Sequence, residues 1–520
     1  MLRRTLFFFL LTTTILLAQM PARIEGQVLD AVTGAPIRKA VVTLTRKNAR
    51  DYRPAEADTD ASGRFHFTGI PPGEYTLAAG ARGYLLLNQD SARQPRREGT
   101  LFTLAPAQDL SGLVLRLTPF GAVSGRILDQ DGDPVAFVEV RVWHVTYRNW
   151  VRELTSDLDH KALTDDRGIF RIAGLFHGRY YLSATPPNRT APNPQTARYV
   201  RTWHPGAFEP AGATPIDVAS GVEQAIPNLK LSRIETVSLR GRVLAQVPAN
   251  LLLSPDGLNP YGDVCTTFRS NPSDGAFAID GLVPGAYRLL ASTQEGASSA
   301  TMHRNLTIGS TGIDNLTLQP VPSVAMEGRI RVEGTSDLTD LSKARVYFMP
   351  LYLNPALSSI QPPIKNGTFS LTSVIPGRYQ LVVTNLPGNL YFRSAAIDLP
   401  PARPLEIVLH PNAAGVTGTV VLPDSEVSVP DATILLIPQE TSRNDPFAYV
   451  KTTADSQGRF SIQSLPPGPY KAYAWSFGWP TIVDQLYFDP EFMRPFESGG
   501  VALSLGENDH PDVKLVLLSQ

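Results

Sequence analysis

Tryptophan is the residue type in this 520-residue chain that is best suited to binding. The five tryptophans gather in three aromatic-rich segments, 143–150, 199–208 and 473–480. Exposed flat rings suit the apolar faces of sugars, and Trp and Tyr also anchor protein interfaces. The alternative is that these rings cover loops or seal contacts between neighbouring domains. The candidate ligand-binding residues are Trp143, Trp150, Trp203, Trp475, Trp479 and Tyr487.

Motifs for metal binding and catalysis are weak. Asp58, Asp60 and Ser62 are spaced like the first half of a calcium loop, but position 12, which needs a bidentate acid, is Gly69. The acidic run 129–133 is better explained as an Asp-Gly turn. None of the eight histidines has the His-x-x-Glu or His-Glu-x-x-His spacing of zinc sites. We therefore expect no metal, no cofactor and no enzymatic activity, although a triad of distant residues would leave no such motif.

Cys265 is the single cysteine of the chain, so an intramolecular disulfide is impossible. A reactive thiol needs a nearby base or cation that lowers its pKa. The adjacent residues, Val264 and Thr266, supply none. We expect Cys265 to be a buried structural thiol.

An internal repeat shows which elements would position these side chains. In five segments a Gly is followed by Phe at plus 2, an apolar residue at plus 4, another at plus 7, a second Gly at plus 10 and Tyr at plus 12. The first Gly and the Tyr of the five copies are Gly63 and Tyr75, Gly168 and Tyr180, Gly275 and Tyr287, Gly367 and Tyr379, and Gly458 and Tyr470.

Each repeated position has a physical reason. The first Gly follows Asp, Ser or Asn, which is typical of a hairpin turn that needs positive φ. The residues at plus 2 and plus 4 share one face of a strand, because side chains alternate with period two. The Tyr opens the next strand, and we expect its hydroxyl to bond to a nearby backbone group. The sequence therefore predicts an all-β protein, a tandem array of about five β-sandwich domains.

A strand with its own Gly precedes each copy, at Gly26, Gly125, Gly241, Gly328 and Gly418. A glycine there permits close approach of a neighbouring backbone. The third copy is the least regular, because its second strand is hard to place between Gln246 and Thr267. The predicted domains, called modules 1 to 5 below, are 23–119, 120–235, 236–321, 322–412 and 413–520.

The N-terminus has the pattern of a signal peptide, predicted to span 1–22. Arg3 and Arg4 precede an apolar run from Leu6 to Ala18, which is too short to span a bilayer. An uncleaved N-terminal anchor is the alternative. The 47 Lys and Arg residues against 48 Asp and Glu leave no field to attract nucleic acid or an anionic membrane. We expect neither partner, apart from the membrane that the signal peptide meets.

The repeat resembles the carboxypeptidase regulatory-like domain. Its first copy reads EGQVLDAVTGAPIRKAVVTLTR, followed by TDASGRFHFTGIPPGEYTLAAGARGY, and its second reads SGRILDQDGDPVAFVEVRVW, followed by TDDRGIFRIAGLFHGRYYLSA. The resemblance covers about four-fifths of the chain and implies a transthyretin-like (prealbumin-like, Ig-like) sandwich, similar to starch-binding-type folds and Cna B-type repeats. It implies no catalysis, because the catalytic domain that accompanies it in carboxypeptidases is missing. The first strands lack the Lys of Cna B-type cross-links, so none is expected.

These observations favour an exported, non-catalytic binding or structural protein of the bacterial cell envelope. Its place would be periplasmic, cell-surface or secreted, and its partner an envelope protein or polysaccharide. One alternative is a carbohydrate-binding protein that uses the aromatic residues of modules 2 and 5. Another is an accessory subunit of a secreted peptidase or other hydrolase.

Overall fold

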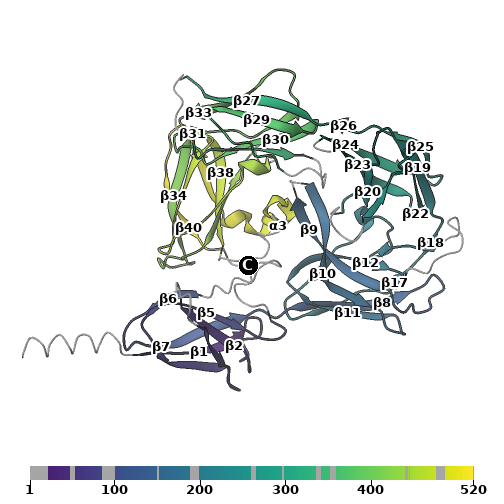
Figure 1. Cartoon of the computed structure of the whole chain (residues 1–520). Coiled ribbons are helices and arrows are strands. Elements are labelled where there is room, and N and C mark those ends of the chain that lie inside the picture. The colour runs from purple at the N-terminus through teal and green to yellow at the C-terminus, as the bar shows by residue number, and fades with distance from the viewer. Residues whose placement is uncertain are drawn as a thin grey trace, which may run out of the picture. The chain divides into compact units, whose positions relative to one another are not determined.

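The computed structural model describes residues 21–46, 53–84, 100–148, 151–187, 198–258, 265–295, 298–334, 341–351, 359–439, 443, 445–475 and 486–518 (Figure 1). Most of the predicted signal peptide, residues 1–20, lies outside this described part. The chain divides into two compact units, 1–142 with 157–184 and 214–230, and 143–156 with 185–213 and 231–520. None of the helices in the described ranges has the length and apolar character needed to span a bilayer.

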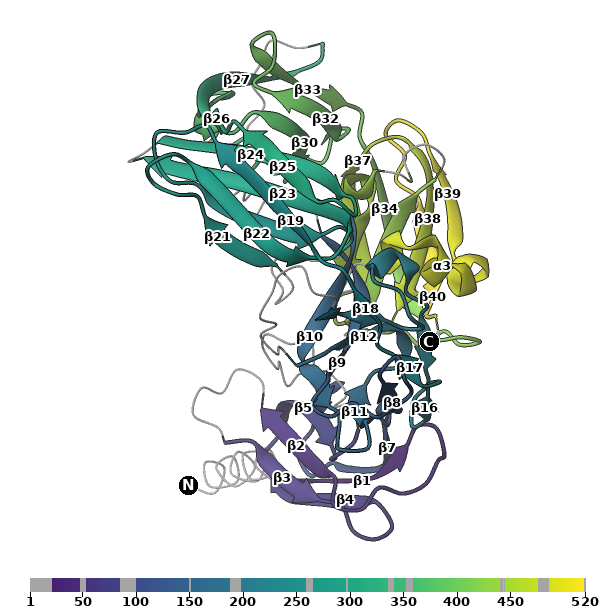
Figure 2. The same cartoon turned by 90° about the vertical axis from the view of Figure 1, so that its right-hand side faces the viewer.

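The protein is all-β, and module 1 shows its building plan. The strands of module 1 form two sheets, β4-β1-β7 and β3-β2-β5-β6 (Figures 1 and 2). The sheets enclose a core of apolar side chains such as Val28, Val42, Phe65 and Leu77. The strands are β1 (Ala22–Asp30), β2 (Val41–Arg46), β3 (Ala55–Asp58), β4 (Arg64–Ile70), β5 (Gly73–Gly80), β6 (Thr100–Leu104) and β7 (Asp109–Leu117).

In module 2 two long strands, β9 and β10, are neighbours in one sheet, and β9 includes the first part of the aromatic segment 143–150. Its sheets are β11-β8-β16 and β10-β9-β12-β14. The elements are β8 (Gly121–Leu128), β9 (Glu139–Arg148), β10 (Val151–Leu163), β11 (Ile169–Leu175), β12 (Gly178–Thr185), β13 (Arg198–Tyr199), β14 (Thr202–Trp203), the 3-10 turn η1 (Pro210–Gly212), β15 (Ile216–Val218), β16 (Glu223–Ala225), β17 (Leu229–Lys230) and β18 (Arg233–Ile234).

Modules 3 and 4 repeat the two-sheet plan, with sheets β22-β19-β25 and β21-β20-β23-β24-β26, and then β29-β27-β33-β31 and β28-β30-β32. The second strand of module 3, which the sequence did not place, is β20. The strands are β19 (Val237–Val243), β20 (Asn250–Pro255), β21 (Thr266–Arg269), β22 (Ala276–Leu282), β23 (Gly285–Glu295), β24 (Ser298–Ile308), β25 (Ile313–Leu318), β26 (Val321–Pro322), β27 (Val324–Val332), β28 (Arg345–Pro350), β29 (Thr368–Val374), β30 (Gly377–Thr384), β31 (Leu390–Tyr391), β32 (Ala395–Leu399) and β33 (Leu405–Pro411).

Module 5 combines the sheets β37-β34-β40 and β36-β35-β38-β39 with short helical segments, most of which lie between β38 and β39. The elements are β34 (Ala414–Val421), β35 (Thr433–Pro438), η3 (Pro446–Ala448), β36 (Val450–Thr453), β37 (Arg459–Leu465), β38 (Gly468–Trp475), η4 (Leu486–Phe488), α3 (Pro490–Met493), η5 (Arg494–Gly499), β39 (Val501–Leu505) and β40 (Asp512–Val516).

In every module the first strand is central to its sheet and carries the repeated glycine opposite the repeated Phe. In module 5, Gly418 pairs with Phe460 across β34 and β37. A Cβ on Gly418 would lie 2.1 Å from the Val513 carbonyl oxygen and 2.8 Å from the Phe460 ring. The missing side chain therefore makes room for both a backbone and an aromatic ring. The other pairs are Gly26 with Phe65, Gly125 with Phe170, Gly241 with Phe277 and Gly328 with Phe369.

The turn before the Phe strand is tight, but it is not the hairpin that the sequence suggested. In module 1, Asp60 Oδ1 accepts hydrogen bonds from the backbone N–H groups of Ser62 and Arg64, at 2.8 and 2.9 Å. The flanking strands β3 and β4 belong to different sheets, so the turn carries the chain from one sheet to the other. The φ values of Gly63, Gly168, Gly275, Gly367 and Gly458 lie between 71° and 74°.

The repeated Tyr fixes the next crossing between the sheets. The Tyr379 side chain is fully buried, and its hydroxyl donates to the carbonyl oxygen of Ile375, four residues earlier, at 2.8 Å. The same bond joins Tyr75 to Pro71, Tyr287 to Val283 and Tyr470 to Pro466. Tyr180 in module 2 is half-buried, and His177 replaces the Pro of the other copies there.

Candidate functional site

Trp143 and Trp203 pack against each other instead of facing solvent. Each side chain is 1% exposed, and their ring centroids are 5.1 Å apart with the planes tilted by 48°. The Arg201 guanidinium carbon lies 5.8 Å from the centroid of the Trp143 ring, within reach of a cation–π attraction. The pair thus joins the middle of β9 to the short strand β14.

Trp475 belongs to a second core of module 5, on the outer face of the sheet β36-β35-β38-β39. Its ring stacks on Tyr473 at 5.5 Å and meets the edge of Phe496 at 5.7 Å. Met493 from α3 is fully buried against the same group. We call the segment 486–500, which closes over this face, the module 5 cap. Leu435 and Ile437 of β35 complete the cluster, so β35 is buried on both faces.

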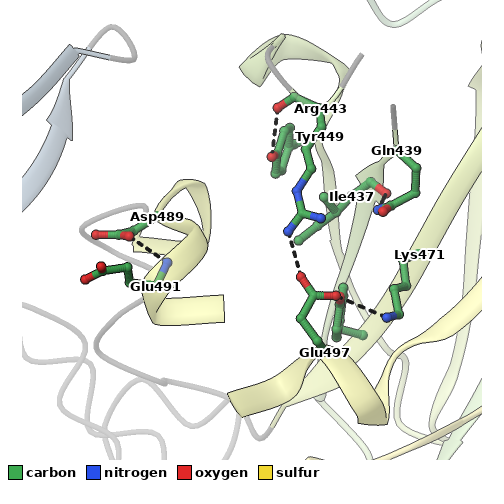
Figure 3. A network of polar contacts seen from close by, with 9 residues as sticks. Ile437, Gln439, Arg443, Tyr449, Lys471, Asp489, Glu491 and Glu497 are labelled. Atoms are coloured by element: carbon green, nitrogen blue, oxygen red, sulfur yellow. Dashed lines mark hydrogen bonds and ion pairs between the residues drawn. The ribbon is translucent and has the colours of Figure 1, made fainter. Parts of the chain in front are cut away.

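A polar network anchors the cap (Figure 3). Glu497 of η5 accepts hydrogen bonds from Arg443 at 2.7 Å, from Lys471 at 3.1 Å and from the Tyr473 hydroxyl at 3.1 Å. The Tyr449 hydroxyl donates to the Arg443 carbonyl oxygen at 3.0 Å. Burial alone raises the pKa of Glu497, but the bonds from Arg443 and Lys471 outweigh it and hold this pKa below its usual value. The carboxylate therefore ties three separate segments of module 5 together.

The expectation of exposed tryptophan faces is wrong for the three described tryptophans. Trp143, Trp203 and Trp475 are each 1% exposed and offer no face to a sugar ring. Trp150 and Trp479 lie outside the described residues, so their role stays a prediction. Tyr487 belongs to the module 5 cap and is half-buried against the Trp475 cluster, and burial raises its pKa to about 12. The three described tryptophans are buried against neighbouring side chains, which agrees with the alternative that the sequence left open.

Cys265 has the properties of a structural thiol. It is half-buried, and burial raises its pKa to about 11 in spite of the favourable charge of Arg288. A thiol with such a pKa is almost fully protonated at neutral pH and is a poor nucleophile. Across the described residues, no group of three or more His, Cys, Asp or Glu side chains is placed to hold a metal ion.

A buried ion pair links β10 of module 2 to module 3. Glu153 of β10 is fully buried and accepts a hydrogen bond from Arg288 of β23 at 2.9 Å. The backbone N–H of Leu154 donates to the Gly257 carbonyl oxygen at 2.9 Å. Arg288 also donates to the Leu258 carbonyl oxygen. Backbone and side-chain groups therefore both join the segment 153–154 to module 3.

Modules 4 and 5 are joined by side chains that bond to backbone. Ser464 Oγ donates to the carbonyl oxygens of Leu386 and Pro387, at 3.2 and 3.1 Å. Arg393 donates to the Pro467 carbonyl oxygen at 2.7 Å, and the Ser394 hydroxyl bonds to Asp445. Ser464 has φ of 60°, although it is not a glycine. At this repeat position modules 1 to 3 have Gly69, Gly174 and Gly281, all with positive φ.

Residues 23–110 match the family of the carboxypeptidase regulatory-like domain. Module 1 is a carboxypeptidase regulatory-like domain. The match ends within module 1, but the Gly–Phe pairs recur in every module, and the Tyr bond to the residue four earlier is described in modules 1, 3, 4 and 5. No curated protein sequence matches the chain at a significant level.

Solved structures with similar sandwich arrays include three bacterial pilins. A minor pilin of Streptococcus agalactiae is 15% identical with a TM-score of 0.23, and 41% of this chain is matched to 96% of that one. The shaft pilin SpaA of Lactobacillus rhamnosus GG is 10% identical with a TM-score of 0.21, covering 42% of this chain and 98% of the pilin. The major pilin subunit BcpA of Bacillus cereus is 10% identical with a TM-score of 0.14, covering 76% and 99%. At such TM-scores the likeness carries no weight for function.

The residues that join the modules were not found from the sequence. Glu153, Arg288 and Ser464 are not among the residues that define the repeat, which are the two Gly, the Phe, the two apolar residues and the Tyr. One signal was available for Ser464, because it replaces the glycine that modules 1 to 3 have at the same repeat position. A non-glycine residue in that conformation costs roughly 1–2 kcal/mol, and such strain is often stored at functional positions.

Proposed function

We propose that this chain is an exported, non-catalytic scaffold of the bacterial cell envelope, built from one carboxypeptidase regulatory-like domain and four related modules. The observation that carries this proposal is the use of the repeated residues. The Gly–Phe pairs lie within a sheet of every module, the Asp turns are described in modules 1, 2 and 5, and the Tyr hydroxyl bonds in modules 1, 3, 4 and 5. The recurring side chains make contacts within their own module. The repeat is therefore the repeat of a structural unit, and not of a reactive site.

The contacts between modules favour a scaffold over a chain of domains that move independently. The Glu153–Arg288 pair has a fully buried carboxylate, and Ser464, Arg393 and Ser394 reach from one module to the next. Domains joined only by linkers move freely, whereas bonded interfaces restrict that motion. Binding through Trp143, Trp203 or Trp475 is not part of the proposal, because those rings are buried.

The proposal is tested by producing the full chain in a bacterium and separating the cell fractions. We expect the protein in the periplasm, on the surface or in the medium, with its N-terminus shortened to near residue 22. A matched variant with Arg3→Glu and Arg4→Glu should be retained inside the cell. Recovery of the unaltered chain in the cytoplasm would contradict export. Release of C-terminal residues from a peptide panel, or cleavage of glycans, would contradict the non-catalytic part.

A further inference from the structure

A cleft lies between modules 4 and 5, next to the joint that Ser464 makes. Its volume is about 540 Å³, within the range of about 300–1,000 Å³ that small-molecule sites have. Module 4 contributes the end of β30 and the segment 392–394, and module 5 contributes residues 445–451 and the end of β37. Both walls lie in the same compact unit of the chain.

The walls are fixed before any ligand arrives. Ser464 bonds to the backbone of module 4 on one side, and Arg393 and Ser394 bond to module 5 on another. A Cβ on Gly388 would lie 2.6 Å from Gln463 Oε1, so the backbone of module 4 and a side chain of module 5 lie in close contact. A preformed site loses less conformational freedom on binding than one that must first be ordered.

The lining combines groups that suit a sugar. Asn385 and Gln463 are exposed amides that line the cleft, and each can donate and accept at once, as neighbouring sugar hydroxyls require. Phe392 is a half-buried aromatic residue of the same lining, able to cover the apolar face of a sugar ring. Tyr449 also lines the cleft, but its ring packs against Phe488 at 4.8 Å. An apolar ligand would leave these amides without partners, and so would be disfavoured.

The charged side chains that line the cleft favour an acidic ligand. Arg393 and Lys451 bring two positive charges to the lining, against the single carboxylate of Asp445. That carboxylate already accepts hydrogen bonds from the Ser394 hydroxyl and from the Phe447 N–H, the latter at 3.0 Å. The cations thus remain in excess where a ligand would sit. We propose that the cleft between modules 4 and 5 binds a short acidic oligosaccharide, with Lys451 and Arg393 facing its carboxylates. This goes beyond the scaffold function, which needs no ligand.

The test is calorimetric titration of the full exported chain with trigalacturonic acid, and with maltotriose as a neutral sugar of equal length. We expect saturable binding of the acid, about tenfold tighter than that of maltotriose. Lys451→Ala should weaken it by about fivefold, the size of one exposed charge contact. Asn385→Gly should also weaken binding of the acid. Glycine is chosen because it readily adopts the φ of 56° that Asn385 has. Lys230→Ala, which removes an exposed lysine of module 2, should leave binding unchanged.

Three results would overturn the inference. These are no saturable heat with trigalacturonic acid up to about 10 mM, equal affinity for maltotriose, or unaltered binding by Lys451→Ala and Asn385→Gly. Lys451 and Asn385 are exposed, so the variants should fold, and an unchanged melting temperature checks this. Failure of binding would leave the scaffold proposal intact, because export and fractionation are measured separately.

Discussion

The hydroxyl of Ser464 lies 3.2 Å from the carbonyl oxygen of Leu386 and donates to it across the boundary between modules 5 and 4. The same residue occupies a left-handed backbone conformation, with φ of 60°, where related modules have glycine. Its side chain therefore stabilises a joint between modules, while its backbone is strained within its own module. The two effects can be separated by substitution.

Ser464→Ala should destabilise modules 4 and 5 more than Ser464→Gly does. Both variants lose the bonds to Leu386 and Pro387, worth about 1 kcal/mol net. Only the alanine variant keeps the left-handed strain, which costs roughly 1–2 kcal/mol relative to glycine. Calorimetric unfolding of the full chain measures the difference. Equal stability of the two variants would show that φ at position 464 carries no strain.

Gly418→Ala should destabilise module 5 by roughly 1–3 kcal/mol, because overpacking displaces neighbours. The new Cβ would fall 2.1 Å from the Val513 carbonyl oxygen, a backbone atom that cannot rotate away. Gly309→Ala is the matched control, since a Cβ there meets nothing within 4 Å. Urea unfolding of both variants checks this, and similar losses at the two sites would contradict the close-approach role of Gly418.

Arg288→Met should cost roughly 3–5 kcal/mol, because the Glu153 carboxylate is fully buried and loses this cation. Glu153→Gln should cost less, because Arg288 keeps an ion pair with Asp256 at 3.4 Å. Glu153→Gln and Arg288→Met test this singly. The double variant should be less destabilised than the sum of the two, since neither charge then remains. A double-mutant cycle from urea unfolding gives the coupling energy. Additive effects would mean that the two side chains do not interact in solution.

Acid should loosen the module 5 cap. A carboxyl group whose pKa is lower in the folded state contributes stability that is present above its unfolded pKa and lost as pH falls through the folded value. For Glu497, whose ordinary pKa is 4.5, the loss therefore begins below about pH 4.5. The emission of Trp475, which stacks on Tyr473 of β38 beneath the cap, should change over this range.

Glu497→Gln should show a flatter pH dependence of that emission, because the amide does not titrate. Glu426→Gln, at a surface residue paired with Lys514 and away from the cap, is the control and should behave like the wild type. Emission from the other tryptophans is common to all three proteins, so the difference between them reports on the cap. If all three titrate alike, Glu497 does not hold the cap.

The repeat made the sandwich fold predictable because its pattern reflects local rules. Phe and an apolar residue two positions later mark one strand face, and the glycine before them has the positive φ that the turn needs. Strand β20 was missed because its apolar run, Leu251 to Leu253, lacks a polar residue that would show the period of two. The crossing turns were read as hairpins because turn chemistry does not tell which sheet the next strand joins.

Burial of the aromatic segments depended on contacts between distant parts of the chain. Trp475 is covered by residues that follow it in the cap, and Trp143 by Trp203, sixty positions later. One local sign was present in β35, where Leu435 and Ile437 make the outer face as apolar as the inner one. A strand that is apolar on both faces must be covered on both. The contacts between modules had no comparable pattern in the sequence, because each contact depends on single residues in separate modules.

In modules 1, 3, 4 and 5 the first strand pairs in parallel with a strand near the end of the module, and this pairing sets how the module responds to tension. In module 1, Gln27 to Asp30 of β1 lie beside Val114 to Leu117 of β7, in the same direction. The chain therefore enters at one end of this strand pair and leaves at the other. A pull on both ends slides the strands past each other, so the evenly spaced hydrogen bonds between them resist together instead of opening one after another. The same arrangement recurs in β19 with β25, β27 with β33 and β34 with β40. A pull on the two ends of each of these modules is therefore opposed by all the hydrogen bonds of its parallel strand pair at once.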